Sequence, residues 1–447
     1  LRARGSLERA GEVLRIVEQR AAAELPANDP LRNDIELAQI AVLQRTGQWQ
    51  DARVRVDRLL AELPVGAIAQ RATALASSAY VAGGAGEHER AERDGVAAVA
   101  LARSANDEAT LQAALRALGS LRIDAGDGAA AVPVFEELLA TDRARYGDTH
   151  ASIAEEEAAL ARAHRLAGHR EEALAHGRRA VAIGDAVYPP DHWLRGLHRN
   201  ALVMALIENR AFDEAADVQR EALRLDRLNR AESDPNLVMA WGTQAIVLGA
   251  IERWDEAAAA DEEALRLALA QGDPRARLVG RLRLFYGYVL AMRGRRDEGE
   301  KELAEALAVA RALGDDEFAA NVTTQQARVA LNVGDLAAAG ERIAALDAIS
   351  RDFRDRPNWP GRVGTFVAEH ALASGDATRA REALADASRE MTGVGRVDPI
   401  VATSHALLAA AIAPGDTALR DAARAKLGSL PFPPPHVRRL ATAAGLD

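Results

Sequence analysis

Apolar positions along the chain follow the period of an α-helix and are interrupted at regular intervals by short polar strings. In residues 194–209, LRGLHRNALVMALIEN, apolar side chains stand at 194, 197, 201, 202 and 205. Because a helix turns once every ~3.6 residues, these side chains share one face, and we predict a helix there. Downstream of the polar strings, alanines recur seven residues apart, as at Ala215 and Ala222 or Ala257 and Ala264. Seven residues make about two turns, so each pair forms a narrow face that a neighbouring helix can approach closely.

The polar strings are copies of one motif. They read GHREEA at 168–173, RAFDEA at 210–215, ERWDEA at 252–257 and GRRDEG at 294–299, each 42 residues after the last. Weaker copies begin at 47, 86, 126, 334, 375 and 415, and the intervals along the whole series are 39, 40, 42, 42, 42, 42, 40, 41 and 40 residues. Helical patterns flank each string, so the predicted unit is a helix–turn–helix hairpin with helices of about 14–18 residues. No apolar run predicts a strand of convincing length.

The predicted helix starts and turns carry residues that suit them. Asp-Pro pairs stand where first helices should begin, at 29–30, 234–235, 273–274 and 398–399. Aspartate accepts from free amides at a helix start, and proline lacks an N–H that would have no partner there. Ser152 and Glu155 have the spacing of a capping box. Glycine at most turns suits a positive φ, although Arg210 and Glu252 replace it in two units.

The repeat resembles the tetratricopeptide repeat over nearly the whole chain. That family has a glycine at its turn and an alanine five residues later, as at Gly168 and Ala173. Trp241 matches the family's first-helix aromatic residue, and Gly119 and Gly287 match its small residue before the turn. The resemblance implies an all-α fold, a right-handed superhelical solenoid of about ten helix–turn–helix repeats with a period of 39–42 residues.

The 42-residue units resemble the longer subclass found in kinesin light chains and in many bacterial multi-repeat proteins. RYGDTH at 145–150 and VYPPDH at 187–192 match the YG-x-x-H string that this subclass carries before each first helix. The separation of 42 residues between His150 and His192 is then the repeat period, not the spacing of a ligand pair. Asn200 falls where the subclass tends to carry asparagine.

The ends of the chain depart from the period. GSLERA at 5–10 is another copy of the motif, so we expect residues 1–29 to be the second helix of a truncated repeat whose native chain continues upstream of Leu1. We expect residues 30–430 to form the solenoid. Prolines at 431, 433, 434 and 435 should exclude a helix, and residues 431–447 are predicted to form a proline-rich cap over the last repeat.

Composition narrows the class of partner. The formal net charge is −10, which is not typical of proteins that bind nucleic acid. The chain has no cysteine, which excludes disulfides and thiolate metal sites. The sequence contains no run of about 18 apolar residues, the length that a membrane-spanning helix needs, so we expect no direct membrane insertion. We therefore expect a protein or peptide partner in the cytoplasm, or in the periplasm if a membrane span lies upstream.

Candidate catalytic and metal chemistry is weak. His164, His169 and His176 lie in one repeat, but the chain crosses a turn between the first two, and the last two do not share a helix face. We interpret them as surface and turn residues, not as metal ligands. The nucleotide-binding, zinc-protease and hydrolase motifs are absent, and acidic pairs such as Glu171 and Glu172 recur with the repeat. We expect no cofactor and no catalytic residue in this segment.

By the resemblance, the first helix of each repeat lines the inside of the superhelix. An asparagine there can bind the backbone of an extended peptide, and an arginine can pair with acidic side chains. Counting back from each turn gives the candidate peptide-binding residues Arg162, Arg165, Asn200, Met204, Met239, Thr243, Arg281, Tyr288, Thr324 and Arg328. The alternative, that a given residue only solvates the inner wall, stays open for each. Their arrangement does not match the carboxylate clamp of the chaperone-binding members.

One aromatic group lies in an interruption of the repeat. Phe353 and Trp359 belong to the string RDFRDRPNWPGR at 351–362, and Phe366 follows it. We favour the interpretation that they pack this longer loop down, and the alternative is a partner-binding insertion.

The expected function is protein–protein interaction. The array is rich in arginine and alanine and has lysine only at 301 and 426, which resembles the repeat region of bacterial serine/threonine protein kinases. We therefore expect a regulatory or sensory scaffold of a larger bacterial signalling protein, with any kinase activity outside this segment. The alternatives are the effector-binding arm of a bacterial transcriptional regulator and a free-standing adaptor.

Overall fold

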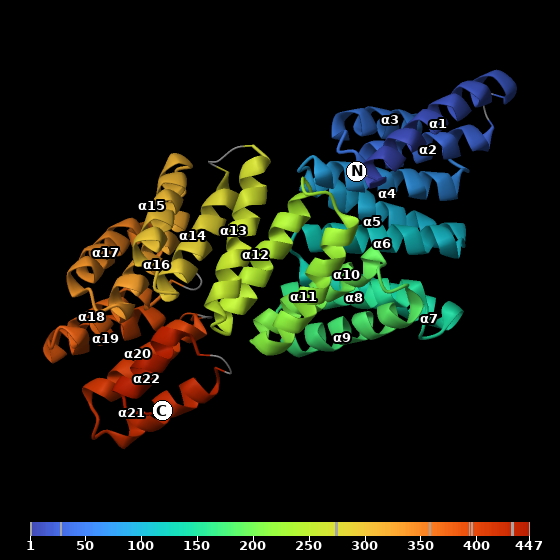
Figure 1. The fold of residues 1–447 in the computed structure, drawn as a ribbon. Helices are drawn as coiled ribbons and strands as arrows, with labels where there is room; N and C mark the ends of the chain where they lie inside the picture. Colours follow the sequence, from blue (N-terminus) through green and yellow to red (C-terminus); the bar gives the residue numbers. More distant parts are fainter. Residues whose placement is uncertain are drawn as a thin grey trace. The chain divides into compact units, whose positions relative to one another are not determined.

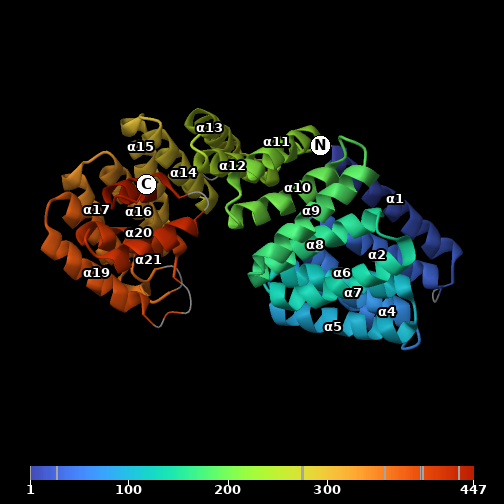
Figure 2. The ribbon, with the colours of Figure 1, turned by 90° about the horizontal axis from the view of Figure 1, so that it is seen from below.

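The structure is a computed structural model of the 447-residue chain, and it describes residues 2–26, 29–272, 276–356, 359–392, 394, 397–430 and 433–446, with the backbone alone at 2–8. Within these ranges the regular elements are all helices (Figures 1 and 2). The chain divides into two compact units. Unit 1 contains Leu1–Asn209 and Leu228–Ala231, and unit 2 contains Arg210–Arg227 and Glu232–Asp447.

Unit 1 begins with α1, continues with four hairpins and ends with α10. Its helices are α1 (Arg2–Glu24), α2 (Pro30–Arg45), α3 (Trp49–Glu62), α4 (Ile68–Gly84), α5 (His88–Ala105), α6 (Glu108–Asp124), α7 (Gly128–Tyr146), α8 (Ala151–Ala167), α9 (Arg170–Val187) and α10 (Trp193–Glu208). Each hairpin packs against the next in chain order, which is the arrangement of a solenoid.

Unit 2 begins with α11, continues with five hairpins and ends with one further helix. Its elements are α11 (Phe212–Asn229), whose last two residues fall in unit 1, then α12 (Pro235–Ala250), α13 (Trp254–Ala270), α14 (Arg277–Met292), α15 (Arg296–Ala312), α16 (Asp316–Asn332), α17 (Leu336–Ile349), the short 3-10 helix η1 (Arg351–Phe353), α18 (Arg362–Ala373), α19 (Ala377–Met391), α20 (Pro399–Ile412), α21 (Thr417–Gly428) and α22 (Pro435–Ala443). Within unit 2, α15, α17 and α19 lie on the outside, and α14, α16 and α20 lie on the inside (Figure 2).

The predicted turns are confirmed. Glycines at most hairpin turns have positive φ, for example 82° at Gly168 and 97° at Gly294, whereas Gly415 at the turn of the last hairpin does not. Arg210 and Glu252 adopt the same left-handed conformation, with φ of 57° and 62°. A side chain there costs backbone energy that glycine avoids, so these two replacements need a reason elsewhere in the structure.

The predicted Asp-Pro helix starts are confirmed wherever the structure describes them. The side chains of Asp29, Asp234 and Asp398 accept hydrogen bonds from Leu31, Asn236 and Ile400 amides at 2.9, 2.9 and 2.8 Å, and proline follows each at the first helical position. The pair at 273–274 lies outside the described residues.

The YG-x-x-H strings end in histidine caps. His150 Nδ1 accepts from the Ser152 amide at 3.2 Å, and His192 Nδ1 accepts from the Leu194 amide at 3.3 Å. Each ring also stacks on the preceding tyrosine, at 4.3 Å between the His150 and Tyr146 centroids. The capping box predicted at Ser152 and Glu155 is therefore wrong, since α8 already begins at Ala151 and His150 is its cap. Histidine can serve as the cap because its ring nitrogen reaches the free amide of the first helical turn, while the face of its ring packs on the tyrosine.

Small residues let the helices of a hairpin approach closely. A Cβ atom at Gly287 would lie 2.8 Å from the Gly299 carbonyl oxygen, and one at Gly299 would lie 2.5 Å from the Gly287 oxygen. Real Cβ atoms do not approach backbone so closely, so any larger residue would separate α14 from α15. The small residue that the repeat pattern predicts at the end of the first helix is thus a packing requirement.

The aromatic group near the interruption is part of the core. Phe353, Trp359 and Phe366 are each buried, and the Phe353 and Trp359 rings meet edge to face at 4.8 Å. They pack with residues of α16, α17 and α18, including Leu346 and Val363. The interpretation that these rings pack the longer loop is confirmed for the described residues; Pro357 lies outside them.

The expectation that the prolines exclude a helix at the C-terminus is wrong. Helix α22 begins at Pro435, because proline is accepted at the first helical position, where its missing N–H has no partner to lose. Val437, Leu440 and Ala441 of α22 pack into a core with Leu407 and Leu408 of α20. Pro431 lies outside the described residues.

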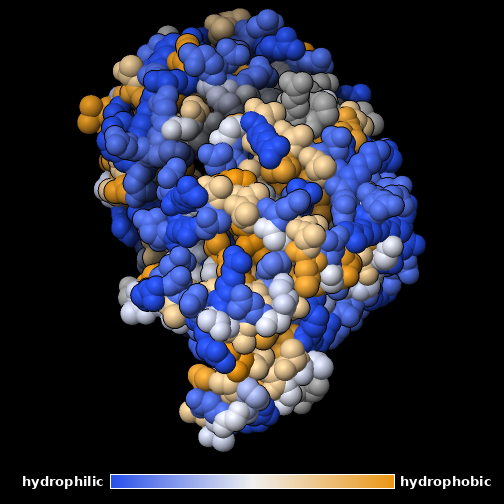
Figure 3. Space-filling view, turned by 90° about the vertical axis from the view of Figure 1, so that its left-hand side faces the viewer, coloured by the Kyte–Doolittle hydropathy of each residue, from blue (hydrophilic) through white to orange (hydrophobic). Residues whose placement is uncertain are grey.

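The surface hydropathy and the apolar character of the helices complete the description of the fold. Seen from the side of α17, α18 and α19, the surface is mostly hydrophilic, with hydrophobic side chains gathered toward the middle of the view (Figure 3). Over the described residues, none of the helices combines the length and apolar character needed to cross a bilayer.

Candidate functional site: a cavity in unit 2

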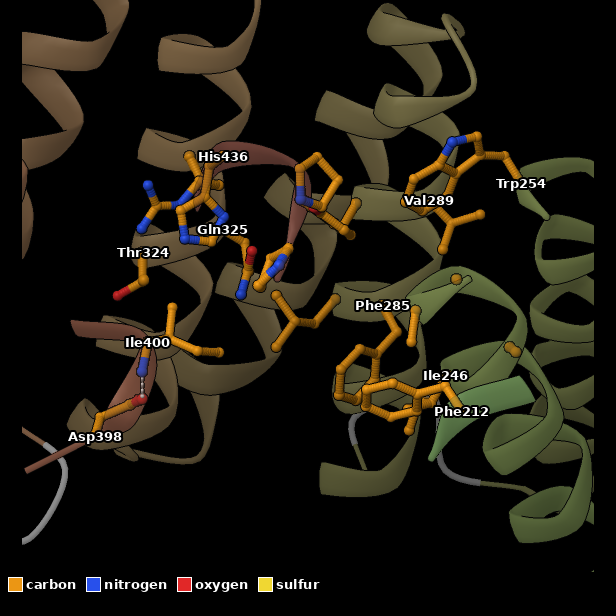
Figure 4. A pocket seen from close by; sticks show the side chains of 18 of the residues that line it. Phe212, Ile246, Trp254, Phe285, Val289, Thr324, Gln325, Asp398, Ile400 and His436 are labelled. Carbon is orange, nitrogen blue, oxygen red and sulfur yellow. Dashed lines mark hydrogen bonds between the residues drawn. The ribbon is translucent and has the colours of Figure 1, made fainter. Parts of the chain in front are cut away.

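A cavity of about 400 Å³ lies inside unit 2 (Figure 4). It is formed mainly by the first helices of five successive hairpins. They contribute Ala245, Ile246, Gly249 and Ala250 from α12, Leu284, Phe285, Tyr288 and Val289 from α14, Thr324, Gln325 and Arg328 from α16, Arg362 and Phe366 from α18, and Ile400 and Val401 from α20. Its volume is in the range of small-molecule and short-peptide pockets.

Most of the wall is apolar and aromatic. Phe212 of α11, Trp254 of α13 and Phe285 of α14 lie on one side of the cavity, near Ile246 and Val289 (Figure 4). Such a wall favours a ligand with bulky apolar groups, because burying them releases water from both surfaces.

One end of the cavity carries a buried ionic network. The Arg328 guanidinium lies 4.2 Å from the Phe366 ring centroid, and its Nη1 donates to Glu369 Oε2 at 3.0 Å. The other oxygen of Glu369 accepts from Arg439 of α22 at 2.5 Å, and Arg439 also donates to Asn332. One carboxylate is therefore shared by two arginines.

A second ionic group lies at the N-terminus of α20. Arg362 Nη2 lies 3.4 Å from Asp398 Oδ2, and its guanidinium stacks 4.6 Å from the Trp359 centroid. Arg210 also lines the cavity, and the charge of Asp398 acts on it as well. Asp398 is already the cap of α20, since its Oδ1 accepts from the Ile400 amide (Figure 4).

Burial shifts the pKa of each of these arginines downward. For Arg210, Arg328 and Arg362 the loss of hydration is the largest cause, and it outweighs the neighbouring carboxylates that act in the opposite direction. A lowered pKa means that the charged form is less well solvated inside the protein than in water.

Burial disfavours the charged form of two further titratable groups that line the cavity. Asp261 is 1% exposed, its carboxyl oxygens have no hydrogen-bond partner in the part of the chain that the structure describes, and burial raises its pKa well above the usual range. Burial lowers the pKa of His436 well below its usual range, reinforced by the charges of Arg328 and Arg439. In both groups the loss of hydration on burial favours the neutral form over the charged one.

The C-terminal helix forms one wall. Pro434, Pro435 and His436 line the cavity, and Arg438 pairs with Glu252 at the α12–α13 turn. Both non-glycine residues at left-handed hairpin turns are thus engaged here: Arg210 lines the cavity and Glu252 binds α22. The unfavourable backbone conformation of these two residues thus occurs at this site. Strained residues often lie at binding sites.

Three of the candidate residues predicted from the sequence meet at this cavity. Tyr288, Thr324 and Arg328 line it, on α14 and α16. Met239 and Thr243 lie on α12 and Arg281 lies on α14, but none of the three is in its wall, and Thr243 Oγ1 donates to the Met239 carbonyl at 2.9 Å. Sequence reasoning missed the residues from second helices and from α22. The replaced turn glycines at 210 and 252 were the signal that could have found this site.

The remaining candidates lie in unit 1, on α8 and α10, and form a separate group. Arg165 Nη1 donates to Glu208 Oε1 at 3.1 Å, and Arg162 lies 3.8 Å from Asp124. Met204 is 38% exposed, and Asn200 is half-buried. The two arginines are thus already paired with carboxylates of neighbouring helices.

The three histidines of one repeat meet in space, which the sequence argument did not foresee. His164 Nδ1 lies 3.2 Å from His169 Nδ1, the His164 ring stacks on His176 at 5.0 Å, and His176 Nδ1 lies 2.6 Å from Glu157 Oε2. His164 is buried, so the interpretation of all three as surface residues is wrong for it. Within the described residues, no group of three or more histidine or acidic side chains has the arrangement of a metal site.

No protein-family model matches this chain, and no curated protein matches its sequence. Solved structures do match. The apo form of RapI aligns with a TM-score of 0.61 at 10% identity, over 82% of this chain and 99% of that one. The apo form of the quorum sensor NprR from B. thuringiensis aligns with a TM-score of 0.56 at 12% identity, over 78% and 99%.

A protein from Podosopora anserina, described as a putative kinesin light chain with nearly identical TPR-like repeats, aligns over 45% of this chain at 18% identity and a TM-score of 0.41. That score is too low to support the kinesin-light-chain-like subclass, which stays a prediction. The higher-scoring alignments extend over most of the chain, and they agree with the helical hairpins, glycine turns and small-residue packing described above. The chain has the all-α solenoid fold of tetratricopeptide-repeat proteins.

Proposed function

We propose that this chain is a protein-interaction scaffold that binds a peptide segment in the cavity of unit 2. The observation that carries the proposal is the wall itself, in which first helices of five hairpins present aromatic and cationic side chains to one cavity. A peptide offers apolar side chains for the aromatic wall and polar groups for the buried ions. The candidate residues of unit 1, Arg162, Arg165, Asn200 and Met204, would form a second contact region.

The biological context is also a proposal. We infer a regulatory or sensory region of a larger bacterial signalling protein, such as a serine/threonine kinase, and expect it in the cytoplasm, or in the periplasm behind a membrane span. The effector-binding arm of a transcriptional regulator is the second candidate. The likeness to NprR, described as a quorum sensor, favours it through the fold alone. The sequence adjoining this segment separates the two, since a kinase has a catalytic loop and a regulator has a DNA-binding module.

The peptide-binding proposal is tested by display selection. Random peptides are selected on the purified chain, and the affinity of the enriched peptides is measured by fluorescence anisotropy. Phe285→Arg introduces a long charged side chain into the cavity wall and should weaken binding at least about tenfold. Leu313→Arg, at an exposed leucine outside the wall, is the matched control and should leave the affinity unchanged.

Enriched peptides that bind Phe285→Arg as tightly as the parent chain would remove the site from this cavity. In that event the triple variant Arg162→Ala, Arg165→Ala and Asn200→Ala asks whether unit 1 carries the binding. Circular dichroism confirms that each variant keeps its helix content.

A further inference from the structure

We propose that α22 occupies a helix-binding surface on the inner face of unit 2, and that a helix of a partner protein binds there in its place. The partner helix would have the chemistry of α22, which is an apolar stripe beside two adjacent basic residues. The inference goes beyond the peptide proposed for the cavity, because it concerns the surface beneath α22 and a second ligand.

Helix α22 contacts several hairpins, not only the one that precedes it. Its apolar side packs on Leu407 and Leu408 of α20, beside which it lies in Figure 1. Arg439 donates to Asn332 at the end of α16 and to Glu369 of α18, which lie 107 and 70 residues earlier in the chain. A further solenoid unit would pack on its immediate neighbour. A contact that extends across hairpins is the arrangement of a ligand helix in a groove.

The side of α22 that faces unit 2 has a simple pattern. Val437, Leu440 and Ala441 are buried and stand at positions i, i+3 and i+4, which form one stripe on a helix. Arg438 and Arg439 lie between these residues in the sequence, and both pair with carboxylates of unit 2. The surface beneath α22 therefore matches an apolar stripe with adjacent basic residues.

The carboxylate that pairs with Arg438 has an unfavourable backbone conformation. Glu252 stands at the α12–α13 turn with a φ of 62°, whereas the next turn of the series has Gly294, with a φ of 97°. Glycine would be favoured at both positions on backbone grounds. The charge that Glu252 presents to α22 accounts for the replacement. The surface therefore has a feature directed at the helix that it binds.

The second carboxylate keeps a partner when α22 leaves. Glu369 is buried, and it accepts from Arg328 at 3.0 Å and from Arg439 at 2.5 Å. Departure of α22 removes Arg439 and leaves the pair with Arg328 in place. Because Glu369 then has an acceptor oxygen available, the surface can accept a basic side chain of another helix.

The attachment of α22 favours such an exchange. It follows the last hairpin as a single helix of nine residues, and a helix of that length is marginal in water without a surface to pack on. The side chains of Arg438 and Arg439 are 46% and 39% exposed, so solvent screens their ion pairs. A short segment held in this way opens at a lower free energy than the whole unit unfolds.

A labelled peptide tests the exchange on the full chain. The probe is a fluorescein-labelled peptide of residues 434–446, and its affinity is measured by anisotropy. In the parent chain the attached α22 competes with the probe. Leu440→Asp places a charge on the buried stripe and should release α22, so this chain should bind the probe at least about tenfold more tightly than the parent. Equal affinity for the two chains, or no binding to either, would overturn the inference.

A charge reversal tests where the probe binds. A probe with Arg438→Glu should bind the Leu440→Asp chain about two- to fivefold more weakly, because it meets Glu252. Adding Glu252→Arg to that chain should restore the affinity, and Arg210 shows that arginine is accepted at such a turn. Glu256→Arg, at an exposed carboxylate on the first turn of α13, is the control and should restore nothing. Failure of Glu252→Arg to restore binding would place the probe elsewhere and overturn the inference.

A variant that leaves the core intact provides an independent measurement. Glu252→Gly favours the turn and removes the carboxylate that pairs with Arg438. Amide hydrogen exchange in α22 should rise about two- to fivefold, while exchange in α12 and α13 stays unchanged. Glu256→Gln, which removes a carboxylate that pairs with Arg253, is the control and should leave α22 unchanged. Unchanged exchange of α22 in Glu252→Gly would contradict the role of this contact and overturn the inference.

The mass of the parent chain separates a partner protein from a second copy as the occupant. We expect light scattering to give the mass of a monomer over a wide range of concentrations. A parent dimer that dissociates when Leu440→Asp is introduced would assign the surface to α22 of a second copy, and would overturn the assignment to a different protein.

Discussion

At the scale of single residues, the buried histidine of α10 is the clearest case of an ionisable group without polar partners among the described residues. His198 of unit 1 is fully buried, neither ring nitrogen has a hydrogen-bond partner among the described residues, and its Nδ1 faces Gly184. Burial, reinforced by the charge of Arg199, lowers the pKa of His198 to about 4 from 6.5. The neutral ring is therefore required for the native packing of α9 against α10.

This shift predicts an acid-sensitive fold. Because the folded pKa is depressed, the stability linked to His198 is fully present above pH 6.5 and is lost as pH falls toward 4, by up to about 3 kcal/mol. His198→Leu should remove much of the fall in melting temperature between pH 7.5 and 4.5. His88→Leu, at an exposed histidine, is the control. A parent-like pH profile in His198→Leu would assign the acid sensitivity to other groups.

Arg210 offers a separation of stability from binding. Its φ of 57° favours glycine, so Arg210→Gly should leave the melting temperature unchanged or raise stability by up to about 1 kcal/mol. The same variant removes one cationic side chain from the cavity wall and should weaken binding of the selected peptides. The reverse change one repeat earlier, Gly168→Arg, should destabilise unit 1 by about 1 kcal/mol. A fall in stability for Arg210→Gly would mean that the side chain has a structural role.

At the scale of helices and turns, local rules explain most of what the sequence predicts. The period of the apolar positions predicts the helices, and glycine at the turn predicts the hairpin. Both predictions succeed because each pattern depends on residues within a few positions of each other. Tyr288, Thr324 and Arg328 were placed on the inner face by the same counting. Trp254 and Asp261 could not be placed so, because they lie on a second helix, which the counting left out. His436 could not be placed because it lies after the last repeat, where the period has ended.

The histidine cap at His192 predicts how much one capping side chain contributes to the stability of helix α10. His192 holds the start of α10 through its ring nitrogen and stacks on Tyr188 at 4.5 Å. His192→Ala should cost about 0.5–2 kcal/mol, because the Leu194 amide loses its acceptor. His192→Asp restores an acceptor without the stacking and should recover part of that loss. Thermal unfolding measures all three chains; equal melting temperatures for the parent and His192→Ala would show that the cap contributes little.

At the scale of each compact unit, stability is a sum of hairpins and their interfaces, and an end hairpin has only one neighbour. In unit 2 the last hairpin, α20–α21, is covered by α22, which also reaches α16 and α18 through Arg439. The error about the prolines had a physical origin at this scale. A proline forbids the interior of a helix but not its start, and only the apolar residues after Pro435 reveal a helix with a buried face.

The closing helix therefore predicts a graded response to its removal. Truncation after Leu430 uncovers Leu407 and Leu408 and opens the cavity wall, and it should destabilise unit 2 by about 4 kcal/mol or more. Leu440→Ala, which keeps Arg439 and His436, should cost about 2–4 kcal/mol. Hydrogen exchange should rise in α20 and α21 in both chains, with α2–α5 of unit 1 as the internal control. The truncated chain should also lose affinity for the selected peptides, whereas Leu440→Ala should keep it. Unchanged exchange in α20 and α21 after truncation would mean that the last hairpin is stable without its cover, and that α22 serves the cavity alone.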